Sequence, residues 1–308
     1  MSRIGLAIVG LGKIARDQHV PSLKASPAFE LIAVASPHSR LEGVPNYPDL
    51  GALLKAVPNL PAVSLCTTPQ ARFETARVAL EHGCHVLLEK PPAMTTSEVH
   101  LLEELARTRG VALLASWHSR HANGVEPART WLQERQVRKV EVVWKEDVRI
   151  WHPGQTWIWK AGGLGVFDPG INALSILTRI LPGSLVLNSA ELYFPKNCET
   201  PIAAQLQLTS TEGATVHMAL DFLHTGTAHW NIEVDTDAGQ LRLVNGGGEL
   251  QLDGRAVDTP QDTEYARVYA HFAQLVRERR GDVDLAPFRL VADAFLCGRR
   301  VEVAPFVE

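Results

Sequence analysis

A glycine turn near the start of the chain has the spacing that binds a dinucleotide. An apolar run over residues 4–9 leads directly into Gly10, Gly12 and Ala15. In a dinucleotide-binding turn the first glycine allows the sharp bend, the second lets the backbone approach the pyrophosphate, and the third position packs the helix and accepts alanine. The phosphates then bind free N–H groups at the helix N-terminus. A chance turn is the alternative, and the position after an apolar strand favours the binding site.

Ser36 bears on the choice between NAD and NADP. It ends the second apolar run, about twenty residues beyond the glycine turn, where a site for NAD places an Asp or Glu against the ribose 2′-hydroxyl. A carboxylate there would repel a 2′-phosphate, and this chain lacks one. The next residues, Pro37, His38, Ser39 and Arg40, supply a hydroxyl and cationic groups. The segment therefore admits NADP; a solvated polar turn indifferent to the phosphate is the alternative.

Lys90 and Asp168 are the two ionisable residues best placed for catalysis. Lys90 follows an apolar run, and ligands of an open α/β sheet bind beyond the carboxyl ends of its strands. Asp168 precedes Pro169 at the start of a predicted helix. An ammonium can stabilise a developing oxyanion and a carboxylate can accept a proton, as the oxidation of an alcohol requires. A surface charge is the alternative for Lys90 and a helix N-cap for Asp168, and either residue could be the formal base.

Apolar runs alternate with helical segments through the first 120 residues, which predicts a parallel sheet. The predicted strands cover residues 4–9, 29–36, 62–66, 85–88 and 111–115. The remaining candidates for cofactor binding lie just after these strands: Lys13 and Ile14 after the first, His38 after the second, Thr67 and Thr68 after the third, and Glu89 beside Lys90 after the fourth.

The second half of the chain has a different pattern, because strands follow one another without intervening helices. Alternating runs cover residues 139–148, 185–194, 202–209, 214–220, 230–236 and 240–244. They predict one large, mostly antiparallel sheet, with helices over about 169–180, 262–279 and 287–297. We therefore expect an α/β protein with a Rossmann NAD(P)-binding domain over 1–120. An α+β domain for substrate binding and oligomerisation is expected over 121–308, and its terminal helix could pack back on the first domain.

Composition and charge narrow the possible partners. The 308 residues carry a formal net charge of −4, so there is no global basic field to attract nucleic acid or an anionic membrane. The four cysteines are far apart, without the spacing of a metal site or a disulfide framework. No apolar run is long enough to span a bilayer. We expect a cytoplasmic protein without a bound metal, acting on a small molecule.

The order of these parts resembles the Gfo/Idh/MocA oxidoreductase family across essentially the whole chain. The matching motifs are the glycine turn, the triplet Glu89-Lys90-Pro91 and the segment 162–172 around Asp168. Within that family, residues 144–149, 151–155 and 167–175 resemble the branch of bacterial L-arabinose and D-galactose 1-dehydrogenases. The resemblance implies NAD(P)-dependent oxidation of an aldopyranose at C1 to the aldonolactone, with catalysis by Lys90 and Asp168. It also implies a homo-oligomer, a dimer formed through the broad sheet.

Two positions depart from patterns within the family. Many members have His four residues after the catalytic Asp, whereas this chain has Asn172, as do the dehydrogenases it resembles; a histidine-based proton relay is therefore in doubt. Arabinose dehydrogenases that use NADP have Arg after the serine of the second strand, but here Pro37 follows Ser36. We therefore expect the chain to use both NAD and NADP.

Five residues are candidates for sugar binding: Glu146, Asn172, His118, Trp151 and Trp230. Asn172 lies one helical turn after Asp168 and shares its face. Glu146 could accept hydrogen bonds from sugar hydroxyls, or be a solvated strand carboxylate. Indole rings pack against the apolar side of a pyranose, although clustered tryptophans also form cores and interfaces. His118 ends the last predicted strand of the first domain, and a structural histidine is its alternative.

Two rival functions remain open on the sequence. Another family reaction, such as oxidation of inositol or another cyclic polyol, is disfavoured by Asn172 in place of His. A regulatory protein that senses cofactor or sugar without turnover is disfavoured by Lys90 and Asp168, which a sensor does not need.

Overall fold

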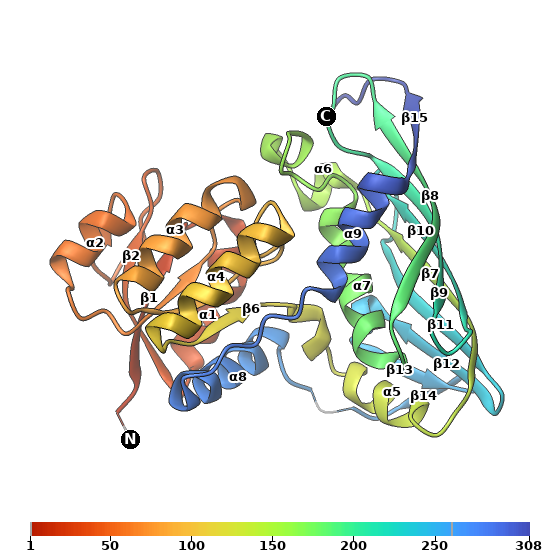
Figure 1. Ribbon diagram of the computed structural model, residues 1–308, viewed down its shortest axis with the longest axis horizontal. Coiled ribbons are helices and arrows are strands. Elements are labelled where there is room, and N and C mark those ends of the chain that lie inside the picture. Colours follow the sequence, from red (N-terminus) through yellow and green to blue (C-terminus); the bar gives the residue numbers. More distant parts are fainter. Residues whose placement is uncertain (1, 260) are drawn as a thin grey trace. The chain divides into compact units, whose positions relative to one another are not determined.

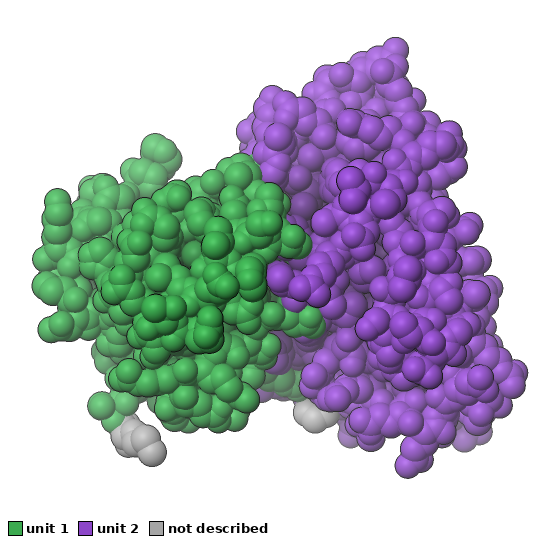
Figure 2. All heavy atoms as spheres, in the orientation of Figure 1, with its two compact units in different colours: residues 1–117, 263–284 green, residues 118–262, 285–308 purple. Residues whose placement is uncertain are grey.

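The computed structural model describes residues 2–259 and 261–308, and the chain forms two compact units (Figures 1 and 2). The first unit comprises the chain up to Trp117 together with Thr263–Asp284. The second comprises His118–Asp262 and Leu285–Glu308. The change of unit thus falls just before the expected boundary at residue 120. The helix α8, Glu264–Glu278, belongs to the first unit. The helix α9, Ala286–Cys297, which is the last in the chain, belongs to the second unit.

Within the described residues of the first unit, six strands form a wholly parallel sheet in the order β3-β2-β1-β4-β5-β6. The strands are β1 Ile4–Val9, β2 Phe29–Ala35, β3 Asn46–Tyr47, β4 Ala62–Leu65, β5 His85–Leu88 and β6 Leu113–Ala115. The order reverses between β1 and β4, and ligands of such sheets bind at this switch point. The predicted parallel sheet is confirmed. The two-residue β3 was not predicted because it is too short to show a pattern.

Helices pack on this sheet through apolar faces. They are η1 Ala15–His19, α1 Val20–Ala25, α2 Leu50–Ala56, α3 Pro69–Glu81, α4 Thr96–Arg109 and α8 Glu264–Glu278. In α8 the buried residues Tyr265, Val268, Tyr269 and Phe272 have the spacing of one helical face. This face joins the core beside Phe29 of β2. A segment distant in the sequence therefore completes the packing of the first unit.

The described part of the second unit contains a nine-stranded sheet in the order β14-β13-β12-β11-β7-β10-β9-β8-β15 (Figure 1). Its strands are β7 Val137–Lys145, β8 Leu185–Pro195, β9 Ala203–Ser210, β10 Thr215–Asp221, β11 His229–Thr236, β12 Gly239–Val244, β13 Glu249–Leu252, β14 Arg255–Val257 and β15 Arg299–Val303. Neighbouring strands are antiparallel except in the pairs β7–β10 and β8–β15. The predicted large, mostly antiparallel sheet is confirmed, with these parallel pairs as an addition.

Helices cover one face of the second sheet, as Figure 1 shows for α5, α7 and α9. The helical segments are η2 His118–His121, α5 Val125–Leu132, α6 Val148–Trp151, η3 Thr156–Trp159, α7 Phe167–Ile180, η4 Asn245–Gly247 and α9 Ala286–Cys297. Val140, Val142 and Trp144 of β7 are buried, whereas Val143 between them is exposed. Successive strand residues point to opposite faces, so the even-numbered side chains of β7 lie on the covered face. Within residues 2–259 and 261–308, every helix is too short or too polar to cross a membrane.

Candidate active site

The glycine turn of the first unit fits a pyrophosphate. Gly10 has a φ of +90°, and a Cβ there would lie 2.8 Å from the backbone nitrogen of Thr67. Only glycine fits such a turn without strain. A Cβ on Gly12 would meet no atom within 4 Å, so the space beside its backbone is open to a ligand. Ala15 is fully buried, as the third position of the motif requires.

The predicted cofactor residues lie after four neighbouring strands of the parallel sheet. Ser36 follows β2 and is half-buried, and its N–H donates to the carbonyl of Tyr47 at 2.9 Å. His38 is exposed, and the guanidinium of Arg16 donates to the carbonyl of Arg40 at 3.1 Å. The other candidates are Lys13, exposed and ion-paired with Asp17, and the half-buried Ile14, Thr67 and Thr68. The ribose end of the predicted site thus has arginines close by and an uncharged Ser36.

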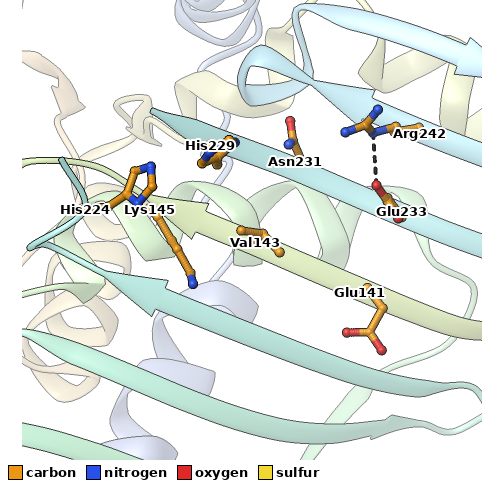
Figure 3. A pocket seen from close by; sticks show the side chains of 8 residues that line it. All are labelled: Glu141, Val143, Lys145, His224, His229, Asn231, Glu233 and Arg242. Carbon is orange, nitrogen blue, oxygen red and sulfur yellow. Dashed lines mark ion pairs between the residues drawn. The ribbon is translucent and has the colours of Figure 1, made fainter. Parts of the chain in front are cut away.

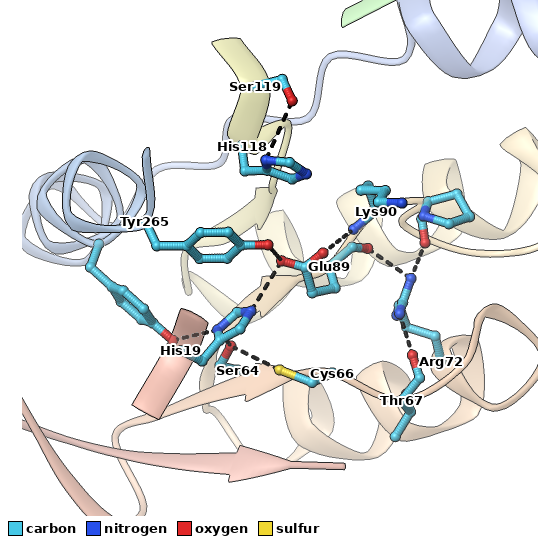
Figure 4. Close-up of polar contacts among 12 residues, drawn as sticks. His19, Ser64, Cys66, Thr67, Arg72, Glu89, Lys90, His118, Ser119 and Tyr265 are labelled. Carbon is cyan, nitrogen blue, oxygen red and sulfur yellow. Dashed lines mark hydrogen bonds and ion pairs between the residues drawn. The ribbon is translucent and has the colours of Figure 1, made fainter. Parts of the chain in front are cut away.

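Lys90 lies beyond β5 on a backbone segment held by a buried arginine. Arg72 of α3 is 3% exposed, and its Nη1 donates to the carbonyl of Glu89 at 2.8 Å and to that of Pro91 (Figure 4). Its Nη2 donates to the carbonyl of Thr67. One guanidinium therefore links the segment that carries Lys90 to the segment after β4.

Glu89 is buried, and both of its carboxylate oxygens contact protein groups. Oε1 accepts a hydrogen bond from the Tyr265 hydroxyl at 2.8 Å and lies 3.1 Å from Nε2 of His19. Oε2 accepts the backbone N–H of Lys90 at 3.0 Å. The expected cofactor contact of Glu89 stays a prediction. Within the protein, its carboxylate contacts Tyr265, His19 and the backbone of Lys90.

Asp168 of the second unit lies inside the first turn of α7. The helix begins at Phe167 with Val166 at the N-cap, so the alternative reading of Asp168 as the N-cap is wrong. Gly165 sets this start, because it has a φ of +54° and a Cβ there would collide with the carbonyl of Pro201. The Asp168 side chain is buried, and the first turn of a helix favours a negative charge.

His152 lies between two buried carboxylates. Its Nε2 is 3.2 Å from Oε1 of Glu146, and its Nδ1 is 3.8 Å from Oδ2 of Asp168. The other oxygen of Glu146 accepts the indole N–H of Trp230 at 2.8 Å. Because Glu146 is 3% exposed, its alternative reading as a solvated strand carboxylate is wrong. The second unit therefore joins Trp230, Glu146, His152 and Asp168 in one polar cluster.

Two tryptophans lie beside this cluster with different exposure. Trp151 is 42% exposed, and its ring centroid is 4.9 Å from that of the half-buried Trp230. Trp144 is buried, with its ring centroid 6.4 Å from that of Trp230. Asn172 is half-buried on α7, one turn beyond Asp168. The exposed ring of Trp151 and the half-buried ring of Trp230 thus lie beside the hydrogen-bonding groups of the cluster.

His118 belongs to the second unit, in the short helix η2. It is half-buried, and its Nδ1 is 3.4 Å from the Ser119 hydroxyl. Arg120 anchors η2 on α7 by donating from Nε to the carbonyl of Ser175 at 2.9 Å. The role of His118 toward a cofactor or a sugar stays a prediction.

A shallow hollow of about 400 Å³ lies on the other face of the second sheet (Figure 3). Its lining includes the odd-numbered Val143 and Lys145 of β7, whereas Trp144 points to the helix-covered face. The full lining is Glu141, Val143, Lys145, His224, His229, Asn231, Glu233 and Arg242. The hollow is therefore separate from the carboxylate cluster.

No role for His152 or Arg72 was predicted from the sequence. His152 lies in the segment 151–155, which resembles the 1-dehydrogenase branch of the family. That resemblance could have indicated a role for it. Arg72 looks like any charged residue on a helix, because its partners lie in loops that only the fold brings to it. The same is true of His19, whose contact with Glu89 spans 70 positions of sequence.

The chain is similar to known proteins in both sequence and fold. The model of an oxidoreductase family with an NAD-binding Rossmann fold matches residues 4–116. Galactose 1-dehydrogenase of Pseudomonas fluorescens is 46% identical over 308 residues, covering 100% of both chains. The crystal structure of a D-galactose-1-dehydrogenase from Rhizobium etli has a TM-score of 0.95 and 51% identity, covering 100% of this chain and 99% of that one.

A more distant solved structure shares the fold alone. A 3-ketoreductase from Actinomadura kijaniata, solved with NADP and TDP-benzene, has a TM-score of 0.85 at 20% identity. It covers 98% of this chain and 100% of its own length.

Proposed function

The chain belongs to the Gfo/Idh/MocA oxidoreductase family, and from this we propose that it is an NAD(P)-dependent aldose 1-dehydrogenase. Its reaction is the oxidation of D-galactose, L-arabinose or both at C1 to the aldonolactone. The observation that carries the proposal is the cluster of Glu146, His152 and Asp168 beside the rings of Trp151 and Trp230. Such a cluster offers what a pyranose needs: acceptors for its hydroxyls and an aromatic surface for its C–H groups.

The sugar would be oriented by groups of the second unit. We assign Glu146, His152 and Asn172 to its hydroxyls, since carboxylate, imidazole and amide all form hydrogen bonds with them. D-galactose and L-arabinose share their ring stereochemistry and differ by the exocyclic hydroxymethyl group. A pocket discriminates only modestly against a group of that size. This supports one enzyme that accepts both sugars.

Lys90 and Asp168 would carry the proton chemistry. A nicotinamide cofactor, when bound, accepts the hydride from C1. The Lys90 ammonium stabilises negative charge on the anomeric oxygen as its O–H bond breaks. Asp168 accepts that proton directly or through water or the lysine. His152 lies between Asp168 and Glu146, with one ring nitrogen facing each carboxylate.

Residues of the first unit would hold the cofactor and allow both forms of it. Gly10, Gly12, Lys13 and Ile14 are assigned to the pyrophosphate, and Ser36 and His38 to the adenosine ribose. Thr67, Thr68, Glu89 and Lys90 complete the assigned set. The uncharged Ser36 and the nearby arginines support use of NADP, whereas Pro37 after Ser36 removes the arginine that would favour NADP strongly. Because the reaction draws on a nicotinamide pool, we place it in the cytoplasm.

We also propose that a second copy of the chain covers the open face of the second sheet. Charges of both signs lie on this face, with Glu141 and Lys145 on β7 and Arg242 paired with Glu233 at 3.0 Å. In a two-fold dimer the same surface of both copies meets, so acidic groups of one copy can pair with basic groups of the other. Light scattering should give twice the mass of one chain, and a monomeric mass at micromolar concentration would contradict a dimer.

The proposed reaction is tested by measuring reduced nicotinamide with a panel of sugars. D-galactose, L-arabinose, D-glucose, D-xylose and myo-inositol are each assayed with NAD and with NADP. The proposal predicts turnover with galactose and arabinose. Turnover with myo-inositol alone would indicate a polyol dehydrogenase, and cofactor binding without any turnover would indicate a sensor.

A further inference from the structure

A pair of ionisable side chains is fully enclosed beneath the segment that carries Lys90 (Figure 4). The side chain of His19 is 0% exposed and that of Glu89 is 3% exposed, with 3.1 Å between Nε2 and Oε1. The other ring nitrogen of His19 lies 2.7 Å from the Tyr269 hydroxyl and 3.1 Å from that of Ser64. The pair thus has hydrogen-bonding partners on both sides.

The charge state of the pair follows from its surroundings. Burial alone would lower the pKa of His19, but Cys66, Tyr269 and Glu89 around the ring raise that pKa well above its usual range. Burial and the charge of Glu89 also raise the pKa of Tyr265 well above its ordinary value, so its hydroxyl stays protonated and donates. Each group that contacts an oxygen of Glu89 can donate a hydrogen bond, as a carboxylate requires.

Stability is a weak explanation for such a pair. Removing two charges from water is costly, and well-packed apolar residues often stabilise a core at least as well. The remaining contact of Glu89 points to another role, because its Oε2 accepts the backbone N–H of Lys90 at 3.0 Å. From the other side Arg72 binds the carbonyls of Glu89 and Pro91. Buried charged groups thus hold the backbone on both sides of Lys90.

We propose that His19 and Glu89 are positioning residues for Lys90. Through its carboxylate, Glu89 fixes the backbone from which the lysine ammonium reaches the reacting oxygen, and His19 holds that carboxylate in place. The Tyr265 hydroxyl of α8 donates to Oε1 of Glu89, the carboxylate oxygen that His19 also contacts. This inference rests on the proposed function, in which Lys90 stabilises the oxyanion. Small displacements of a catalytic group slow a reaction strongly, so this support should be visible in the rate.

The experiment compares Glu89→Gln with Ser64→Ala in the full-length enzyme. Glu89→Gln keeps the size of the side chain and removes its charge, whereas Ser64→Ala disturbs the same cluster on the far side of His19. We expect kcat to fall by about tenfold to a hundredfold in Glu89→Gln. KM for the sugar should change little. Ser64→Ala should lower the melting temperature and keep kcat.

An isotope effect separates positioning from a structural role. With a sugar deuterated at C1, the effect on kcat should rise in Glu89→Gln, because the chemical step becomes slower than product release. If Glu89→Gln does not fold, Tyr265→Phe replaces it, since it removes one donor to the carboxylate and keeps the ring. Its kcat should fall by about threefold, with the same rise in the isotope effect.

The possible failures can be told apart. An active wild type together with an equally active Glu89→Gln or Tyr265→Phe variant would overturn the positioning role alone. A kcat that falls only in proportion to the folded fraction would do the same. A wild type that binds NADPH and oxidises no sugar would contradict the proposed function, and this inference with it.

Discussion

At the scale of single residues, His152 lies between two buried carboxylates of the second unit. It lies 3.2 Å from Glu146 and 3.8 Å from Asp168. A neutral imidazole has one N–H and can donate to only one of them, whereas an imidazolium can donate to both. Both ring nitrogens of His152 therefore face carboxylate oxygens of the second unit.

The proposed catalytic residues should each be indispensable. Lys90→Ala removes the ammonium and Asp168→Asn removes the proton acceptor, so each should lower kcat by about a hundredfold to ten-thousandfold. Circular dichroism should show an unchanged fold. Lys24→Ala and Asp293→Asn, at exposed positions, are matched controls that should keep full activity. Activity near the wild-type level in either test variant would remove that residue from the mechanism.

Ser36 should control the response to the 2′-phosphate. Ser36→Asp introduces a carboxylate where a site for NAD has one, and this charge should repel NADP. We expect the ratio of kcat/KM for NADP to that for NAD to fall by about tenfold, which corresponds to about 1.4 kcal/mol. Ser36→Asn, similar in size without the charge, should shift the ratio less. Equal ratios in wild type and Ser36→Asp would place Ser36 away from the phosphate.

At the scale of elements, the segment with α6 and η3 carries Trp151 and His152 and is held by the end of the chain. The ring of Phe306 lies 4.9 Å from that of Trp159 in η3. The side chain of Asn197 accepts the N–H of Phe306 at 2.9 Å and donates to its carbonyl at 2.8 Å. Asn197 follows β8, so these contacts connect the end of that strand to the proposed sugar-binding segment.

Loss of this contact should weaken sugar binding selectively. Phe306→Ala removes the ring that packs on η3, so we expect KM for the sugar to rise by about threefold to tenfold, as removal of a partly buried aromatic contact allows. KM for the cofactor should stay the same. Val307→Ala changes an exposed neighbour and serves as the control. Initial rates over a range of sugar concentrations decide the matter, and an unchanged KM would show that the segment is ordered without Phe306.

The contact between α8 and the parallel sheet should depend on pH. The pKa of His19 is raised in the folded protein, so the folded state binds more protons than the unfolded state above about pH 6.5. The stability contributed by His19 is therefore complete below that pH and is lost as pH rises toward the folded pKa. The difference in melting temperature between wild type and His19→Gln should shrink from pH 6 to pH 9. A difference that grows would contradict a protonated His19.

Sequence patterns predicted the elements better than their pairing. The glycine turn was predictable because Gly10, Gly12 and Ala15 directly follow a strand in a short local motif. The parallel pairing of β7 with β10 was not, since a strand shows the same alternation beside a parallel or an antiparallel neighbour. The buried group around Glu89 could not be predicted, because Tyr265 lies 176 positions away and reads as an ordinary core residue of a helix.

At the scale of the whole molecule, the proposed functions are divided between two units. The first carries the glycine turn and Lys90, and the second carries Asp168 and the aromatic residues. The chain passes from one unit to the other after Trp117, Asp262 and Asp284. Neither unit is therefore a single continuous segment, and neither contains both proposed catalytic groups.

The measurement that tests the central claim most directly follows the hydrogen at C1. The enzyme is incubated with D-galactose deuterated at C1 and with the oxidised cofactor that supports turnover, and the products are analysed by mass spectrometry. The account predicts one deuterium in the reduced nicotinamide and an aldonolactone, or the acid from its hydrolysis, that has lost it. Deuterium retained in an oxidised sugar would mean that another carbon reacts, and this would contradict a 1-dehydrogenase.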